Sequence, residues 1–353
     1  MALTLDLADV AKQLKSAAGE LGFVLSGITP AATPPGYDAL QAWLAAGYAG
    51  EMHYFAERLP AYRDLNLVLP GASSLLLLAM PYLPASDTPP PEGAGRVASY
   101  AWGVDYHQEL WRRLDTLCEL LRTLVPGCRC RGVTDSAPLL EREFAQLAGL
   151  GWIGKNTLLL NRDYGSWFFL AALVSDVPLP ADQPFAADHC GTCTACLTAC
   201  PTNAFVQPYV LDATRCISYL TIETRTALSE TDRQRIGDWL WGCDICQMVC
   251  PWNNKVPSTT DPAWQPPAGG PAVELGELFY WTDEQFATRF RHTPLWRAKR
   301  RGLLRNAAIV LANQGETRAI PALTQGTADP DELVRAVSAW AIEKLQSKSL
   351  PGP

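Results

Sequence analysis

Apolar residues recur along the first half of the chain with two different periods. Leu7 to Leu21 and Asp105 to Leu124 carry them at helical spacing, and Gly22 ends the first of these runs. Short continuous apolar runs, which are typical of buried strands, lie at Phe23 to Ile28, Ser74 to Met80 and Trp167 to Ser175. Because strands and helices alternate, we expect a sheet with helices packed on it, in a mixed α/β or α+β fold.

The second half of the chain changes character. Residues 185–255 hold a dense set of cysteines, and residues 256–275 are rich in Pro, Gly and Ala, which is typical of a linker. The tail predicts two amphipathic helices, Arg301 to Asn313 and Leu333 to Leu345, with a helix start at Pro321 between them. A helix pair is the unit of HEAT-like α-solenoids, and so short an array has to pack on the rest of the chain. We therefore predict three domains, at 1–184, 185–255 and 256–353.

Length and composition bound the class of protein. The 353 residues are 48% apolar, which is enough for a sizeable core. No apolar run reaches the roughly 18 residues of a spanning helix, so we expect no contact with a membrane. Met1 to Asp6 has no basic leader region and no twin arginine lies near it, which favours a cytoplasmic protein. The lack of coiled-coil heptads in the sequence favours a monomer.

Charge is distributed unevenly. The net charge of −7 does not by itself suggest a nucleic-acid partner. One short window free of acidic residues nevertheless holds Arg289, Arg291, Arg297, Lys299, Arg300, Arg301 and Arg305. Such a run is often only a solvated face, but its concentration in an acidic protein favours an anionic partner.

The cysteines carry the most specific chemical signal. The run from Cys190 to Pro201 reads C-x2-C-x2-C-x3-C-P, in which three thiolates hold one [4Fe–4S] cluster and the fourth holds a second. The run from Cys243 to Pro251 reads C-x2-C-x3-C-P and lacks its first cysteine, which Cys216 is the nearest to supply. By the same crossover, we assign one cluster to Cys190, Cys193, Cys196 and Cys250, and the other to Cys200, Cys216, Cys243 and Cys246.

Zinc is the alternative ligand, because it also binds C-x2-C pairs. Zinc sites seldom need the third closely spaced cysteine, the x3 step and the proline in two copies, so iron–sulfur clusters are favoured. Eight of the eleven cysteines fit cluster spacing, which argues against a disulfide framework. Of the remaining three, we expect Cys118 in a helix core and assign no role to Cys128 and Cys130.

Three stretches of the first domain place polar or flexible residues where elements begin or end. Asp105 and His107 precede the long helix, where they form either a site or an N-cap with an exposed first turn. Asp135 follows a predicted strand end, a common catalytic position, although a helix cap is the simpler interpretation. The loop around Lys155 and Asn156 is punctuated by glycines that allow close backbone approach, but it lacks the order of a phosphate loop.

Several of these motifs occur together in one known family, and they cover nearly the whole chain. They are Tyr100 with Gly103-Val-Asp105-Tyr106-His107, Thr134-Asp135, Gly151-Trp-Ile-Gly-Lys155-Asn156, Arg215-Cys216-Ile-Ser218-Tyr219, the two cysteine runs, and Arg305-Asn306 in the tail. In this combination the chain resembles the epoxyqueuosine reductases. The resemblance implies an oxidoreductase that reduces epoxyqueuosine to queuosine at the wobble position of tRNA, with two [4Fe–4S] clusters and base-off cobalamin.

The resemblance also implies roles for individual residues. Asp135 matches the family's proton donor, and a carboxylic acid donates near neutral pH only if its surroundings raise its pKa. His107 is a second candidate for substrate contact or proton relay, and Asp105 to Leu110 lacks the glycine of a D-x-H-x-x-G cobalt-ligand motif, which agrees with base-off binding. The residues expected around the corrin are Arg63, Arg142, Lys155, Asn156, Ser218 and Tyr219. The residues expected to contact tRNA phosphates are Arg291, Arg297, Lys299, Arg300, Arg301 and Arg305.

Two other functions fit part of the pattern. A reductive dehalogenase-like enzyme would also combine base-off cobalamin with two [4Fe–4S] clusters, but it would not need the basic helical tail. A plain electron carrier would need no corrinoid at all. In each case an electron donor that the sequence does not identify has to reduce the clusters.

Overall fold

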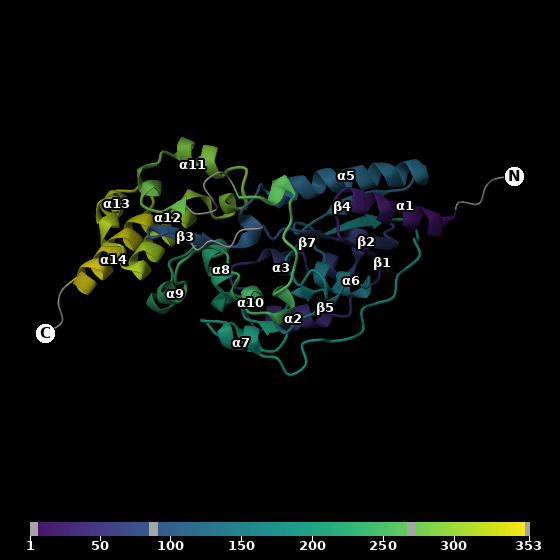
Figure 1. The fold of residues 1–353 in the computed structure, drawn as a ribbon, viewed down its shortest axis with the longest axis horizontal. Coiled ribbons are helices and arrows are strands. Elements are labelled where there is room, and N and C mark those ends of the chain that lie inside the picture. Colours follow the sequence, from purple (N-terminus) through teal and green to yellow (C-terminus); the bar gives the residue numbers. More distant parts are fainter. Residues whose placement is uncertain (1–5, 85–90, 267–272, 350–353) are drawn as a thin grey trace.

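A computed structural model describes residues 6–84, 91–266 and 273–349. The N-terminal half lies at one end of the long axis and the tail helices lie at the other (Figure 1). The helices of the N-terminal half are α1 (Leu7–Glu20), α2 (Tyr37–Ala45), α3 (Tyr54–Glu57), α4 (Leu59–Arg63), α5 (Tyr106–Leu124) and α6 (Glu141–Leu147).

A four-stranded sheet in the order β1-β2-β7-β4 forms the centre of the N-terminal half. Its strands are β1 (Leu25–Pro30), β2 (Ser74–Pro81), β7 (Phe168–Ser175) and β4 (Cys130–Val133). Every neighbouring pair is antiparallel. The predicted mixed fold, a sheet with helices packed on it, is therefore confirmed, and the antiparallel pairing gives it the α+β form.

Strand β2 is buried on both faces, and this explains its continuous apolar sequence. Leu76 and Leu78 pack against α1 and α5, whereas Leu75 and Leu77 pack on the side of α6. This alternation follows from the two-residue period of a strand. The sheet thus lies between two helical layers. At one edge, the end of β4 lies close to the starts of α5 and α6.

The cysteine-rich segment is made of short elements. They are β5 (Trp152–Ile153) and β6 (Leu159–Leu160) in the approach, followed by α7 (Ala195–Ala199), β8 (Phe205–Gln207), β9 (Val210–Leu211), α8 (Ile217–Ile222), α9 (Glu230–Arg235) and α10 (Ile245–Met248). Helices α7 and α10 pack against each other, and they bring the two cysteine runs together.

A second sheet ties the three parts of the chain together. Its strands, in the order β10-β3-β11, are β10 (Trp239–Trp241), β3 (Ala94–Val97) and β11 (Val273–Glu274). Strand β3 leaves the N-terminal half and pairs with β10 next to the second cysteine run, and with β11 at the start of the tail. Trp241 and Leu240 are fully buried in the core that this sheet shares with the tail helices.

The tail is helical, as predicted. Its helices are α11 (Asp283–Phe290), α12 (Lys299–Gln314), α13 (Ile320–Gly326) and α14 (Glu332–Ser349). Pro321 stands in the first turn of α13, which confirms the predicted helix start. Helices α12 and α13 both pack against α14, and α12 packs against β10, so the tail does not stand alone. No helix in the described ranges is long and apolar enough to cross a bilayer.

Candidate active site and cluster centre

The two polar stretches singled out in the N-terminal half meet in one site. Asp105 caps α5, where its Oδ1 accepts the His107 backbone N–H at 3.1 Å and lies 2.8 Å from His107 Nδ1. The other ring nitrogen of His107, Nε2, lies 3.2 Å from Oδ2 of Asp135. The Tyr106 hydroxyl donates to the same Oδ2 at 2.8 Å. Asp105 is therefore both an N-cap and a partner of the site.

Asp135 sits in a tight turn directly after β4. Its φ of 54° places it in the left-handed region, which a non-glycine residue adopts only when its surroundings hold it there. The Asp135 N–H donates to Oε1 of Glu141 at 2.7 Å, across the turn between β4 and α6. The side chain of Asp135 is 55% exposed, so a substrate can reach the carboxylate.

The pKa values in this site do not match the simplest expectation for a carboxylic acid donor. Desolvation raises the pKa of Asp135, but hydrogen bonds from His107 and Tyr106 outweigh it, and the net shift is downward. Desolvation lowers the pKa of His107, but its bonds to Asp105 and Asp135 outweigh that effect and raise the pKa to about 9. Near neutral pH the proton therefore lies on His107, and Asp135 is ionised. The surroundings that the protein itself provides therefore lower the pKa of Asp135, contrary to the expectation that they raise it.

Glu141 is a second carboxyl group of the site that sequence reasoning missed. Burial and the nearby charge of Asp135 raise its pKa to about 8. Neighbouring carboxyl groups whose pKa values are pushed apart are typical of acid–base sites. In the sequence Glu141 is simply an acid in the first turn of a helix, a common position, so no local signal distinguishes it.

One residue of the basic tail reaches this site. Arg297 Nε donates to Oε1 of Glu223 at 2.7 Å, and the positive charge of Arg297 contributes to lowering the pKa of Asp135. Burial and the charge of Glu223 raise the pKa of Tyr54 in the same region to about 12. Arg297 thus links the tail electrostatically to the site formed by Asp135 and His107.

The electrostatic neighbours of the eight predicted ligands agree largely with the two sets expected from the crossover, and the assignment of each cysteine to a cluster stays a prediction. Burial raises the pKa of the Cys250 thiol, and the thiols of Cys190 and Cys193 raise it further. The pKa of Cys196 is likewise raised by burial and then by Cys250 and Cys190. These four thiols are therefore electrostatic neighbours, although Cys250 lies far from the others in the sequence.

The second set shows the same relationship. Burial raises the pKa of the Cys243 thiol, and Cys216 and Cys200 raise it further. The pKa of Cys246 is also raised, first by burial, then by Cys243 and Cys216, and more weakly by Asp244 and by Cys196 of the other set. Cys216, the predicted replacement for the missing first cysteine, is thus grouped with the expected partners. The fourfold thiol donor sets fit two [4Fe–4S] clusters, since bound iron offsets the cost of ionising buried thiols.

Backbone amides prepare the thiols for a charged group. The N–H groups of Tyr219 and Ser218, at the start of α8, lower the pKa of Cys216, although burial acts more strongly in the opposite direction. Trp252 and Asn253 donate in the same way to Cys250.

No group of three or more His, Cys, Asp or Glu side chains in the described part of the chain is arranged to hold one single metal ion. A cubane instead spreads its thiolates over several irons.

Two of the six residues predicted around the corrin, Arg142 and Lys155, contact the loops near the active site and the first cysteine run. Arg142 is exposed, donates to the Thr157 carbonyl at 2.6 Å and lies within electrostatic reach of Glu141 and Asp135. Lys155 Nζ donates to the Gly191 carbonyl at 2.6 Å and to the Cys193 carbonyl at 2.9 Å, in the first cysteine loop.

The other four predicted corrin residues are placed less uniformly. Asn156 is buried, and its amide lies 3.5 Å from the Cys246 carbonyl. Ser218 is partly exposed beside Cys216, whereas the Tyr219 hydroxyl accepts the Glu51 N–H at 2.7 Å. Arg63 is exposed, with its guanidinium 5.9 Å from the ring of Tyr37. Corrin contacts for all six residues stay predictions.

The basic stretch of the tail does not form one open positive surface, and the prediction for Arg305 is wrong. Arg305 is only 1% exposed and donates to the carbonyls of Thr224 at 2.7 Å and Leu220 at 2.6 Å. It is an internal link between α12 and the end of α8, so it is not available to tRNA phosphates.

Other cations of the stretch are paired. Arg300 lies 2.6 Å from Asp329, and Arg301 lies 3.2 Å from Asp331. Lys299 and Arg291 are exposed, and Lys299 Nζ lies 4.5 Å from the centre of the Trp296 ring. The Arg300–Asp329 pair is largely buried, whereas the more exposed pair of Arg301 with Asp331 contributes little to stability.

Comparisons with known proteins agree with this geometry. Residues 63–136 match the family model described as epoxyqueuosine reductase QueG, DUF1730, and residues 189–253 match a 4Fe-4S double cluster binding domain. The chain is 44% identical to the epoxyqueuosine reductase of Pseudomonas aeruginosa over 345 residues, covering 96% of this chain and 95% of that protein. It is 40% identical to the epoxyqueuosine reductase of Escherichia coli over 346 residues, covering 97% and 91%.

A solved structure of the same kind is closely similar in three dimensions. It is an epoxyqueuosine reductase with a tRNA-Tyr epoxyqueuosine-modified stem loop, and it superposes with a TM-score of 0.89 at 32% sequence identity. The similarity covers 96% of this chain and 91% of that one.

Proposed function

This chain belongs to the epoxyqueuosine reductase family, and from that premise we propose that it reduces epoxyqueuosine to queuosine in the anticodon loop of tRNA. The observation that carries the proposal is the pairing of one acid–base site with two sets of four cluster cysteines in a single chain. A small-molecule dehalogenase is the alternative, but the similarity to tRNA-modifying relatives extends through the helical tail. Because tRNA is the substrate, the proposal places the enzyme in the cytoplasm, and we propose that it acts as a monomer.

The reaction requires two electrons and two protons. Both carbon–oxygen bonds of the epoxide break, a carbon–carbon double bond forms, and the oxygen leaves as water. When bound, the two [4Fe–4S] clusters and base-off cobalamin supply the electrons. The residues of this chain have to bind the groups, orient the epoxide and deliver the protons.

The chain fits a cobalamin bound without a histidine ligand. Both ring nitrogens of His107 lie within bonding distance of carboxylates, at 2.8 Å from Asp105 and 3.2 Å from Asp135, so this imidazole has no nitrogen free for cobalt. Arg63, Arg142, Lys155, Asn156, Ser218 and Tyr219 would hold the corrin and its side chains. A corrin in this position would lie between the catalytic carboxylates and the cysteine loops.

Proton delivery follows from the charges in the site. His107 holds a proton between Asp105 and Asp135, and its pKa of about 9 keeps that proton in place near neutral pH. Asp135 faces the reacting oxygen and transfers the proton that His107 supplies, while Tyr106 orients its carboxylate. Glu141, with a pKa of about 8, holds a second proton next to the same turn.

The tRNA would reach this site through the tail. Chemistry on a base requires that the wobble nucleotide leave the stack and enter the protein. Arg291, Arg297, Lys299, Arg300 and Arg301 would contact phosphates, and Arg297 would do so beside Asp135. The helices α12 to α14 would act here as a HEAT-like platform, and an unidentified donor would reduce the clusters.

The two candidate functions are separated by a paired assay. Reconstituted protein with a chemical reductant is given epoxyqueuosine-containing tRNA in one reaction and a small aryl halide in the other. Consumption of the modified nucleoside without release of halide supports the proposal. Release of halide with unchanged tRNA would replace it with the dehalogenase alternative.

A further inference from the structure

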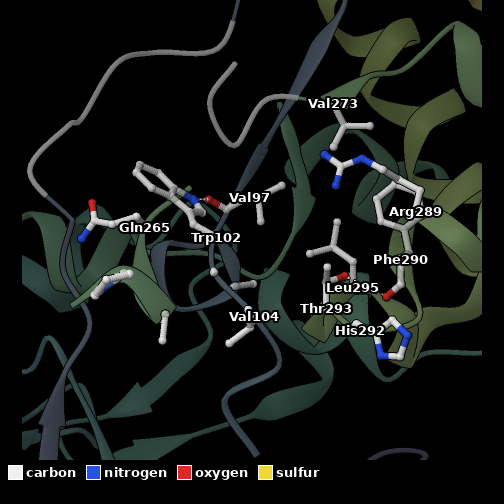
Figure 2. A pocket seen from close by; sticks show the side chains of 14 residues that line it. Val97, Trp102, Val104, Gln265, Val273, Arg289, Phe290, His292, Thr293 and Leu295 are labelled. Carbon is white, nitrogen blue, oxygen red and sulfur yellow. Dashed lines mark hydrogen bonds between the residues drawn. The ribbon is translucent and has the colours of Figure 1, made fainter. Parts of the chain in front are cut away.

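A pocket of about 310 Å³ opens beside the catalytic site, on the other side of the segment that precedes α5. Its walls come from four parts of the chain: residues 97–104, the segment 262–265, Val273, and the stretch from Arg289 to Leu295. Figure 2 shows the guanidinium of Arg289 reaching inward, across from the indole of Trp102. The volume lies at the small end of the range for ligand pockets and suits one nucleoside-sized group.

Asp105 contacts both a residue that lines this pocket and the catalytic histidine. The Asp105 N–H donates to the carbonyl of His292, a lining residue, at 3.1 Å. The side chain of the same Asp105 lies 2.8 Å from His107 Nδ1. A chain of nucleotides with its wobble base at His107 would therefore place a neighbouring nucleotide at this pocket.

The pocket has aromatic and apolar walls, and contacts within the chain hold these walls in place. Trp102 donates its Nε1–H to the Val97 carbonyl at 2.7 Å, which holds the indole in place. Val104 lines the same pocket and is 48% exposed. Gly103 lets the segment 262–265 cross closely, because a Cβ at this position would lie 2.1 Å from the Ala263 carbonyl oxygen. Unstacked bases bind to such aromatic surfaces.

Arg289 gives the pocket an uncommitted positive charge. Arg297, Arg300 and Arg301 each lie within ion-pairing distance of a carboxylate. For Arg289, in contrast, no carboxylate in the described ranges lies within that distance, and its guanidinium lies 5.7 Å from the ring of Phe290. A cation beside an apolar slot matches a nucleotide, which has a flat base and an anionic phosphate.

From this arrangement we propose that the pocket binds the nucleotide adjacent to the wobble position, with its base against Trp102 and Val104 and its phosphate at Arg289. This inference rests on the proposed function, since it assumes that an anticodon loop is bound. It makes the pocket a second recognition site, which positions the flipped wobble nucleotide by holding its neighbour.

The test is an abasic scan of a tRNA anticodon stem loop, measured as the dissociation constant with wild-type protein and with two variants. Val104→Trp fills the pocket from an exposed position, and Arg289→Gln removes only the charge. Arg318→Gln is the matched control, because Arg318 is 73% exposed and pairs with Glu316 elsewhere on the tail. Thermal unfolding of each variant shows whether it is folded.

We expect wild-type protein to bind about tenfold more weakly when one of the two wobble-flanking bases is removed, the size typical of one stacked base. Val104→Trp should bind the intact loop about as weakly as wild type binds the abasic loop. Removing that same base should then weaken binding by Val104→Trp no further. Arg289→Gln should reduce the salt slope by about one, and Arg318→Gln should not change it.

Two results would overturn the inference. One is a Val104→Trp variant that binds the intact loop like wild type. The other is an abasic penalty of the same size in wild type and Val104→Trp. Turnover by the wild-type protein separates this failure from a failure of the proposed function. If the enzyme converts tRNA but the pocket variants have no effect, only the pocket proposal is wrong. If the protein neither binds nor converts tRNA, the proposed function is wrong as well.

Discussion

The Nε2 atom of His107 lies 3.2 Å from Oδ2 of Asp135, which joins the first turn of α5 to the turn after β4. These residues are 28 positions apart in the sequence. Because Asp105 lies on the other side of the imidazole, His107 bridges two carboxylates. The His107 proton is thereby held next to the exposed carboxylate of Asp135.

Asp135→Asn should lose most turnover while keeping iron and cobalamin. The amide cannot carry a proton from His107 to the departing oxygen, so we expect the rate to fall about 100-fold or more. The measurement is initial turnover at matched cofactor content. Asp115→Asn, on the exposed face of α5, is the control and should stay close to wild type. Near-normal turnover by Asp135→Asn would remove Asp135 from the proton path.

The pH profile of turnover should show an alkaline limb set by His107 and Glu141. Both pKa values are raised, to about 9 and about 8, so both groups carry protons near neutral pH and lose them as the pH rises. Glu141→Gln should leave a limb near pH 9, and His107→Gln should remove that limb along with much of the rate. A limb unchanged in both variants would contradict this assignment.

The same shift has a consequence for stability. The folded protein holds the His107 proton more tightly than an unfolded chain with a pKa near 6.5, so this contribution is fully present below about pH 6.5. It is lost as the pH rises through about 9. The free energy of unfolding of His107→Gln, compared with wild type across this window, should therefore depend less steeply on pH.

Cys216→Ser should remove the second cluster and leave the first. Cys216 is grouped with Cys243 and Cys246 rather than with Cys250. We therefore expect iron content to fall by about half, with one [4Fe–4S] signal retained by electron paramagnetic resonance. Cys118→Ser, on the buried face of α5, should keep all the iron. If Cys216→Ser lost both clusters while unfolding at the same temperature as wild type, the two ligand sets would not be independent.

Sequence spacing predicted the parts of the molecule that local chemistry determines. The helix start at Pro321 follows from backbone restrictions within a few residues. The Cys216 assignment follows from ligand spacing and stays a prediction. The placement of Arg305 and Glu141 does not follow from local spacing. Arg305 belongs to a run of exposed cations, and only the packing of α12 against the segment after α8 buries it. The pKa of Glu141 is raised first by burial and then by the charge of Asp135, which a turn brings close to it.

Arg305→Gln should destabilise the protein by about 3 kcal/mol, because it leaves buried carbonyls without donors. These include the carbonyls of Thr224 and Leu220. Arg301→Gln is the control, and its exposed pair with Asp331 should cost less than about 1 kcal/mol. Chemical denaturation measures both. An Arg305→Gln protein as stable as Arg301→Gln would show that the buried guanidinium contributes little.

The central claim is tested most directly by the mass of the modified nucleoside. Anaerobically reconstituted protein, with excess reductant, is incubated with epoxyqueuosine-containing tRNA in the presence and absence of cobalamin, and the tRNA is digested to nucleosides. We expect loss of one oxygen from the modified nucleoside only when cobalamin is present. Unchanged epoxyqueuosine with protein that holds both clusters and cobalamin would contradict this expectation.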